Sequence, residues 1–360
     1  MRKIKVTKHN KLLLGVLIAI LHLSIFFLNW IIEIVVLAIS IIGVLLFLLL
    51  NRAIKRSNWY KNIFLHTTQF ITNWGYRKDL RRNFSVVNLG SNPALFAFEY
   101  DKNYGQNWAT GSQGPEMDLE ILRYYHSYIK EGGVVLLPIV PFSSCTPYLW
   151  HYKKTALGIK YYARFSKVLE NGIQARRVIP NFSKVIHWRH YPLWYSPSIL
   201  KVLIKDVPAD NRLGIDKQEF IGERLIEDAK RWINRWKKEF DIKNLEANID
   251  TKMRRCQEEC ANKFVEIIRF CKDRELKPVL ILPPVTAELN SFLSDKTKET
   301  YIYSFVRMIQ AIETVDLMDY MTYNEFATSS FYINSLFLNK TGRKKFTEQV
   351  LKDLKNMQLY

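Results

Sequence analysis

An almost unbroken apolar stretch near the N-terminus constrains this chain more than any other feature of its sequence. Residues 12–28 and most of residues 31–50 are apolar or uncharged. About 20 residues cross the hydrocarbon core of a bilayer, so the combined stretch is too long for one span. Asn29 and Trp30 interrupt it where a hairpin would turn, and a tryptophan suits the membrane interface. We therefore predict two transmembrane helices, residues 12–28 and 31–50, within an anchor formed by residues 1–56.

Two other interpretations of this stretch were considered. One long, tilted helix could hold the same residues. A cleaved signal peptide fits poorly, because no Ala-x-Ala-like site follows the first segment and apolar sequence resumes at once.

The charges that flank the apolar stretch predict its topology. Lys and Arg lie outside both ends of the stretch, at Arg2, Lys3, Lys5, Lys8, Lys11, Arg52, Lys55, Arg56 and Lys61. The expected hairpin carries only Glu33. Since positive residues favour the cytoplasmic side, we expect a multi-pass protein of the cytoplasmic (inner) membrane with its soluble part in the cytoplasm. A single span would place that part outside.

The charge balance of the whole chain bears on its partners. The 360 residues carry a formal charge of +19, and residues 1–50 hold five Lys or Arg and one Glu, which leaves +15 on the remainder. Such a surface attracts anionic headgroups or an acidic partner. The basic residues are scattered and no nucleic-acid-binding module is recognisable, so we expect the lipid bilayer and not nucleic acid as a partner.

Apolar segments after the anchor alternate between strand and helix patterns. The predicted strands are residues 84–89, 134–140, 278–282 and 314–318, and the predicted helices are residues 115–130, 219–246, 264–273, 287–312 and 342–357. The strands are nearly continuous apolar runs, as in parallel sheets covered on both faces. The alternation predicts an α/β fold, a doubly wound, flavodoxin-like parallel sheet of about five strands.

Two segments depart from this rhythm. Residues 57–83 form a basic and aromatic connector, which we expect to be helical and to lie at the bilayer surface. Within the domain of residues 84–360, residues 143–218 are an insertion rich in aromatic and basic side chains. Its aromatics can stack on sugars, rest at the lipid interface, hold a partner or form the insertion's own core. The candidates for ligand contact are Trp150, Trp188 and Trp194.

Two motifs at opposite ends of this domain carry a family resemblance. Residues 86–92 form a strand followed by Gly90-Ser91-Asn92, and residues 334–342 read Asn-Ser-Leu-Phe-Leu-Asn-Lys-Thr-Gly. They resemble the first and last blocks of the SGNH (GDSL-like) hydrolases and acyltransferases. The first block carries the serine nucleophile, and the last holds an Asp and a His. Here the serine position is Asn92, the Asp position is Asn334 and the His position is Phe337.

Three intermediate segments extend the resemblance in the same order along the chain. Residues 107–114 are similar to the second block, whose amides help to form an oxyanion hole. The resemblance thereby implies a pocket built from Gly90, Ser91, Asn107, Gly111 and Gln113. The third block should hold an Asn, but residues 138–142 have none. Residues 277–286 look like a strand and loop of the branch that includes polysaccharide O-acetyltransferases and teichoic-acid D-alanylation proteins.

The substituted positions remove the chemistry of such a site. A serine hydroxyl needs a base within hydrogen-bond reach, and that base needs an acceptor to orient it. A phenyl ring takes no proton, and the amide of Asn92 forms no ester. The resemblance therefore implies a bacterial-type, membrane-anchored pseudoenzyme that binds or scaffolds in surface-glycan assembly or modification, with a glycan or a membrane protein as its partner.

Two alternatives stay open. The first is an active O-acyl esterase or acyltransferase on a carbohydrate that uses displaced residues, with Ser91 or Ser112 as nucleophile and His126 as base. The second is a structural membrane partner subunit. No cofactor or metal is expected, because the sequence spacing offers no convincing set of ligands. We expect reduced thiols at Cys145, Cys256, Cys260 and Cys271.

Overall fold

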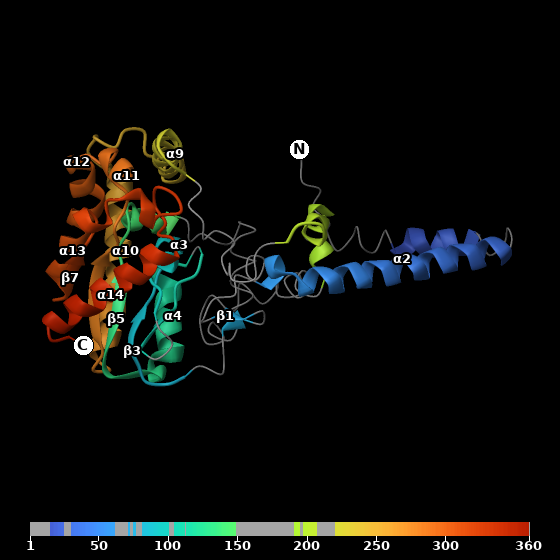
Figure 1. The fold of residues 1–360 in the computed structure, drawn as a ribbon, viewed down its shortest axis with the longest axis horizontal. Helices are drawn as coiled ribbons and strands as arrows, with labels where there is room; N and C mark the ends of the chain where they lie inside the picture. Colours follow the sequence, from blue (N-terminus) through green and yellow to red (C-terminus); the bar gives the residue numbers. More distant parts are fainter. Residues whose placement is uncertain are drawn as a thin grey trace.

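The protein combines an α/β body with a long projecting helix (Figure 1). The computed structural model describes residues 15–24, 30–61, 71–72, 75–76, 81–100, 104–111, 113–148, 191–194, 197–206 and 220–359. The long helix, α2 (Trp30–Arg56), leads away from the sheet. The body contains the sheet and the helices that pack on it.

Helix α2 is long and apolar enough to cross a membrane. Its 27 residues span roughly 40 Å at the α-helical rise. Most of its apolar side chains are exposed, as in a helix that faces lipid. It includes Trp30 and runs past Leu50 to Arg56, because Arg and Lys are good helix formers.

The first predicted span is described only from Gly15 to Ser24, a shorter apolar helix. Residues 25–29, which would form the turn between the two spans, lie outside the described residues. The hairpin of residues 12–28 and 31–50 therefore stays a prediction.

The predicted parallel α/β sheet is confirmed. Five strands lie in the order β4 (Gly105–Asn107), β3 (Phe84–Asn88), β5 (Ile129–Pro138), β6 (Lys277–Leu282) and β7 (Asp316–Asp319), and all neighbours are parallel. In chain order this is 2-1-3-4-5, the order of flavodoxin-like doubly wound sheets. Edge strand β4 was not predicted, since its three residues are too few to show a pattern.

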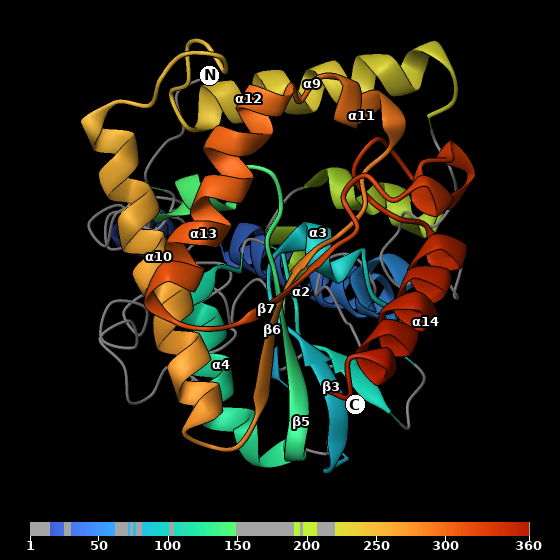
Figure 2. The same ribbon diagram turned by 90° about the vertical axis from the view of Figure 1, so that its left-hand side faces the viewer.

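Helices cover both faces of the sheet (Figure 2). One face packs against α4 (Pro115–Tyr125), α10 (Thr251–Lys272) and α13 (Ser304–Ile312), and the other against α14 (Lys340–Asn356). Successive strand residues alternate between these two cores: Val135 and Leu137 face the first, while Val134 and Leu136 face the second. All four are buried, which explains why the strand is a continuous apolar run.

Helix α4 ends earlier than the sequence predicts. It stops at Tyr125, a 3-10 turn follows (His126–Tyr128), and β5 already begins at Ile129. Gly132 lies within the strand with φ +65°, a conformation that glycine adopts readily. It accompanies an irregularity in the register of β3 and β5. The Gly132-Gly133 pair therefore belongs to a bulged strand and not to a helix end.

Two further predicted helices differ in the structure. Residues 287–312 are divided into α11 (Ala287–Ser291), α12 (Asp295–Lys298), a π-helical turn (Glu299–Tyr303) and α13, because the Ser294 side chain caps a new helix start. In the connector, Ile71–Thr72 (β1) pairs with Gly75–Tyr76 (β2) as an antiparallel ladder. The β-branched Ile71 and Thr72 favour this strand over the expected helix.

Candidate functional site at the carboxyl edge of the sheet

A small pocket lies at the edge of the sheet where β3, β5 and β6 end. It is lined by Pro93, Phe96, Ala97, Val140, Pro141, Pro283, Pro284, Val285, Leu336 and Leu338. Its volume of about 10 Å³ is near the minimum that holds one water molecule. The carboxyl edge is where open α/β sheets bind ligands. Every lining residue is apolar, so the pocket suits an apolar group better than an ion.

Phe337, from the last motif, packs against Phe96, which lines the pocket. Its ring stacks on Phe96, with centroids 4.7 Å apart, and meets Trp232 edge-on at 5.4 Å. The side chain is only 8% exposed. Two segments more than two hundred residues apart therefore meet through an aromatic contact.

The polar positions of the first motif lie beside this contact. Asn92 is exposed in the first turn of α3 (Asn92–Leu95), and Ser91 is half-buried at its N-terminus. The Ser91 side chain makes no capping hydrogen bond.

Asn334 shapes the turn that carries Phe337. Its Oδ1 accepts the backbone N–H groups of Leu336 and Phe337, at 2.9 and 2.8 Å. The next residue, Ser335, is fully buried and donates its hydroxyl and its backbone N–H to Asp228 of α9 (Glu223–Glu239), at 2.7 and 3.1 Å. Asn334 and Asp228 together fix the backbone of this turn.

The end of the last motif starts α14. The Asn339 side chain accepts the N–H of Gly342 at 2.9 Å and so caps the helix. A Cβ on Gly342 would collide with the carbonyl oxygen of Phe331 and lie 2.9 Å from the Phe331 Cβ. The Leu-Asn-x-x-Gly pattern therefore has a structural reason that is independent of catalysis.

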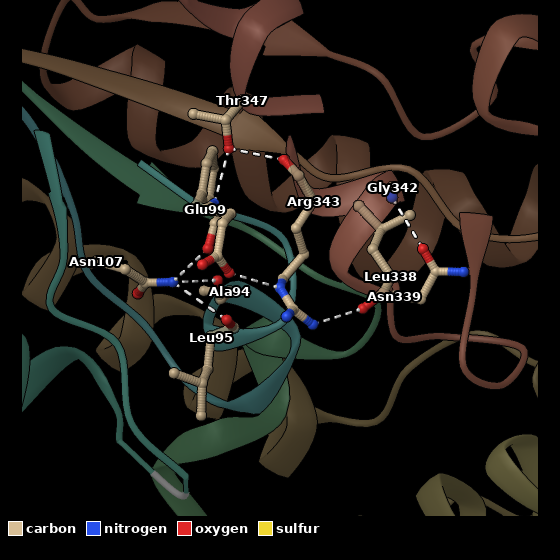
Figure 3. Close-up of polar contacts among 10 residues, drawn as sticks. Ala94, Leu95, Glu99, Asn107, Leu338, Asn339, Gly342, Arg343 and Thr347 are labelled. Carbon is tan, nitrogen blue, oxygen red and sulfur yellow. Dashed lines mark hydrogen bonds and ion pairs between the residues drawn. The ribbon is translucent and has the colours of Figure 1, made fainter. Parts of the chain in front are cut away.

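Arg343 ties the first and last motifs together (Figure 3). Its side chain is 4% exposed, pairs with Glu99 at 3.1 Å and donates to the carbonyl of Leu338 at 3.2 Å. Thr347 adds to the link, because its hydroxyl accepts the N–H of Glu99 and donates to the carbonyl of Arg343. The loop after α3 is thus fastened to the start of α14 (Figure 3).

Asn107 fastens the same loop from the other side. Its Nδ2 group faces three carbonyl oxygens, those of Ala94, Leu95 and Phe98 (Figure 3). Its Oδ1 accepts the Asn88 side chain and the N–H of Ala109. The side chain is 8% exposed and points into the protein. Asn107 supports the chain that carries Phe96.

A buried carboxylate organises the second motif. Asp118, in the first turn of α4, accepts the N–H of Gly90 at 3.0 Å and the side chain of Gln113 at 2.7 Å. Burial raises the pKa of Asp118 to about 7, while these two hydrogen bonds lower it less. Gln113 also donates to the carbonyl of Trp108.

These contacts change the interpretation of the expected oxyanion pocket. The single hydrogen of Gly90 N and both hydrogens of Gln113 Nε2 point to internal acceptors, and Asn107 Nδ2 has more acceptors than hydrogens. None of these three donors has a hydrogen left for a bound oxyanion. Gly111 is buried beside them, and Ser112 lies outside the described residues.

His126 lies at the opposite edge of the sheet from Ser91. It precedes β5, whereas Ser91 follows β3, and Asn88 of β3 pairs with Leu136, seven residues along β5. The separation is roughly 20 Å at the strand rise. The imidazole stacks edge-on against Phe270. His126 therefore does not reach Ser91 as a base.

The other residues that the sequence suggested for ligand contact or metal binding lie elsewhere or outside the described residues. Trp194 is 60% exposed and lies beside α2, away from the pocket, while Trp150 and Trp188 lie outside the described residues. The four cysteines are buried and form no disulfide. In the described part of the chain, no group of three His, Cys, Asp or Glu side chains has the arrangement of a metal site.

Sequence reasoning missed Asp118, Asp228 and Arg343. An acidic residue in the first turn after Gly-Pro is a signal for Asp118, although it normally indicates an exposed helix start. The contacts of Asp228 with Ser335 and of Arg343 with Glu99 join residues more than one hundred positions apart, so no local pattern indicates them.

No protein-family model matches the chain, and no curated protein does. Among solved structures it is similar to the crystal structure of protein YXIM from Bacillus subtilis, with 12% sequence identity and a TM-score of 0.37. The match covers 77% of this chain and 58% of that protein, so the chain spans less than two thirds of its length.

Proposed function

We propose that this protein is a membrane-anchored, SGNH-hydrolase-like protein without catalytic activity, which binds or scaffolds components of surface-glycan assembly or modification. One pocket is lined by the residues directly after the first motif, by the segment at the position of the third block, by the strand-loop segment 277–286 and by the last motif. These segments contribute Pro93 and Phe96, Val140 and Pro141, Pro283 to Val285, and Leu336 and Leu338. This convergence at the carboxyl edge of the sheet is the observation that carries the proposal.

The absence of activity has separate support. The positions for the nucleophile, the orienting acid and the base hold Asn92, Asn334 and Phe337. Three of the donors expected for an oxyanion hole, on Gly90, Asn107 and Gln113, are engaged inside the protein. An active esterase using Ser91 would need another base, because His126 lies at the other edge of the sheet. The glycan context follows from the resemblance of residues 277–286.

The anchor is supported by contacts at the end of α2. The Asn51 side chain accepts the N–H of Leu193, and the Asp206 carboxylate accepts those of Asn58 and Trp59. A leader that is removed after export would leave these distant partners uncovered. The contacts favour retention of α2 as a transmembrane anchor. The flanking Lys and Arg favour a cytoplasmic body if the chain crosses twice, and an external one if it crosses once.

Restoring the missing groups tests the hydrolase-like part of this proposal. Asn334 Oδ1 already meets the N–H of Phe337 at 2.8 Å, and an Asp keeps this acceptor. The triple variant Asn92→Ser, Asn334→Asp, Phe337→His should hydrolyse an activated acetyl ester weakly, while single variants do nothing, because the three groups act as a unit. Activity stays low, because each missing oxyanion donor costs about a hundred- to a thousand-fold.

Wild-type protein is the matched control. A wild-type rate that equals that of the triple variant and disappears in Ser91→Ala would replace this proposal with the active esterase.

A further inference from the structure

Residues 191–194 and 197–206 form an apolar collar at one end of α2. The collar consists of two 3-10 segments, η6 (Pro192–Trp194) and η7 (Pro197–Leu203), with the residues that flank them. Ile199 packs in a small core with Ile54 and Tyr60 of the α2 end. In Figure 1 the collar, in yellow-green, lies beside the end of α2 that faces the body. The collar belongs to the anchor and not to the core of the body.

Polar bonds fix the position of the collar along α2. Leu193 N donates to Asn51 Oδ1 at 3.0 Å, and Asp206 accepts the N–H groups of Asn58 and Trp59 at 2.7 and 2.9 Å. The collar is therefore held at both of its ends.

The collar starts at the level of the apolar part of α2. Phe47 contacts the rings of Tyr191 and Trp194, with centroids 5.5 and 6.0 Å apart. Arg52, the first basic residue of α2, lies five residues further on, roughly 7 Å along the axis. Trp194 is thus on the membrane side of the charged boundary, where tryptophan is enriched in membrane proteins.

The outer surface of the collar is unusually apolar for a surface that faces water. Four side chains are exposed: Trp194 by 60%, Leu200 by 39%, Leu203 by 41% and Ile204 by 92%. Lys201 and Lys205 are exposed among them. An apolar surface interleaved with Lys is typical of a segment that rests in the boundary between headgroups and acyl chains.

We infer that residues 191–194 and 197–206 are a membrane-interface collar, whose exposed apolar side chains insert into the lipid surface around α2. The inference rests on the proposed role of α2 as a membrane anchor. Its occupant is the bilayer, because Trp194 of the collar contacts Phe47 in the apolar part of α2, between the exposed side chains of Leu46 and Leu48.

Spin-label accessibility in the full chain tests this inference. The four native cysteines are buried, so a thiol label attaches to an introduced cysteine, and unlabelled wild type verifies this. The variants are Ile204→Cys and Trp194→Cys in the collar, Leu45→Cys in α2 and Met357→Cys, which is exposed on the body. Each is reconstituted in phosphatidylcholine–phosphatidylglycerol vesicles, and collisions with oxygen and with a water-soluble nickel chelate are measured.

We expect collisions with the nickel chelate to be several-fold fewer at Ile204→Cys than at Met357→Cys. At Trp194→Cys we expect a collision rate closer to that at Leu45→Cys. Ile204 is the decisive site, because its exposed side chain can be replaced without loss of packing. Equal nickel accessibility at Ile204→Cys and Met357→Cys overturns the collar. High nickel accessibility at Leu45→Cys overturns the anchor itself, so the two failures are distinguishable.

Discussion

The carboxyl edge of the sheet and the end of α2 are both held together by a buried asparagine side chain, but their surroundings differ. Each uses a buried asparagine to join separate segments: Asn107 of β4 holds the loop after α3, and Asn51 of α2 holds Leu193 of the collar. At the sheet edge the joined segments cover their apolar side chains, so that Phe337 is 8% exposed. At the end of α2 they leave Ile204 92% exposed. The difference indicates that the first junction is built as protein interior and the second to be completed by lipid.

The buried carboxylate at the sheet edge gives the largest expected effect. The pKa of Asp118 is raised from 3.8 to about 7 by burial, so the fold favours the protonated form. Its stabilising contribution is present below about pH 4 and is lost as the pH rises through about 7. Asp118→Asn keeps an oxygen acceptor and does not ionise. The variant should gain on the order of 4 kcal/mol relative to wild type between these limits.

Denaturant unfolding at a series of pH values measures this difference. Asp316→Asn, at an exposed position, is the control and should follow wild type. If the free energies of unfolding of wild type and Asp118→Asn changed in parallel with pH, the Asp118 carboxylate would be hydrated. The carboxyl edge of the sheet would then not be protein interior.

A methyl group at Gly342 should break the sheet-edge junction. The added Cβ meets the carbonyl oxygen and the Cβ of Phe331, a contact that no side-chain rotation relieves. We expect Gly342→Ala to lower the free energy of unfolding by about 3 kcal/mol. Gly43→Ala in α2 is the matched control, since its Cβ meets nothing within 4 Å. Equal stability of the two variants would show that the start of α14 is loosely packed.

Removing the Arg343 side chain tests the link between the first and last motifs. Arg343→Met leaves Glu99 and the carbonyl of Leu338 without this donor. Because Glu99 is 33% exposed, solvent screens part of the loss, and we expect about 2 kcal/mol. The exposed pair of Arg123 with Glu120 supplies the control, Arg123→Met, which should cost well below 1 kcal/mol, about the value of a surface pair.

Adding Glu99→Gln to Arg343→Met sharpens this test. The second change removes the carboxylate that Arg343→Met leaves behind, so the double variant should recover part of the loss. Strictly additive losses would mean that the two side chains do not interact.

The collar should show the smallest effect. Asn51→Ala removes the acceptor of Leu193 N, a hydrogen bond worth about 1 kcal/mol, so this amide should exchange with deuterium about five times faster. Ser40→Ala is the control, because Ser40 bonds only to the carbonyl of Val36 within α2. An unchanged rate of deuterium exchange at the Leu193 amide would contradict the hydrogen bond between α2 and the collar.

The sequence predicted the sheet because burial on both faces makes strands such as Val134–Leu137 continuous apolar runs. It also pointed to the edge where the motifs at Asn92 and Phe337 lie. It did not predict strand β4 or the bulge at Gly132, because these depend on what a neighbouring strand allows. The pairings of Arg343 with Glu99 and of Asp228 with Ser335 were equally inaccessible, since they join distant segments and leave no local pattern.

Reaction with a fluorophosphonate serine probe tests the central claim, that the sheet edge retains a hydrolase-like frame without its chemistry. The full chain in detergent is treated with the probe beside Ser91→Ala and Ser112→Ala, and an active serine esterase is the positive control. The account predicts that wild type incorporates no probe, because His126 lies at the other edge of the sheet from Ser91 and three of the expected oxyanion donors, Gly90 N, Asn107 Nδ2 and Gln113 Nε2, are engaged. Labelling of wild type that disappears in either serine variant would contradict it.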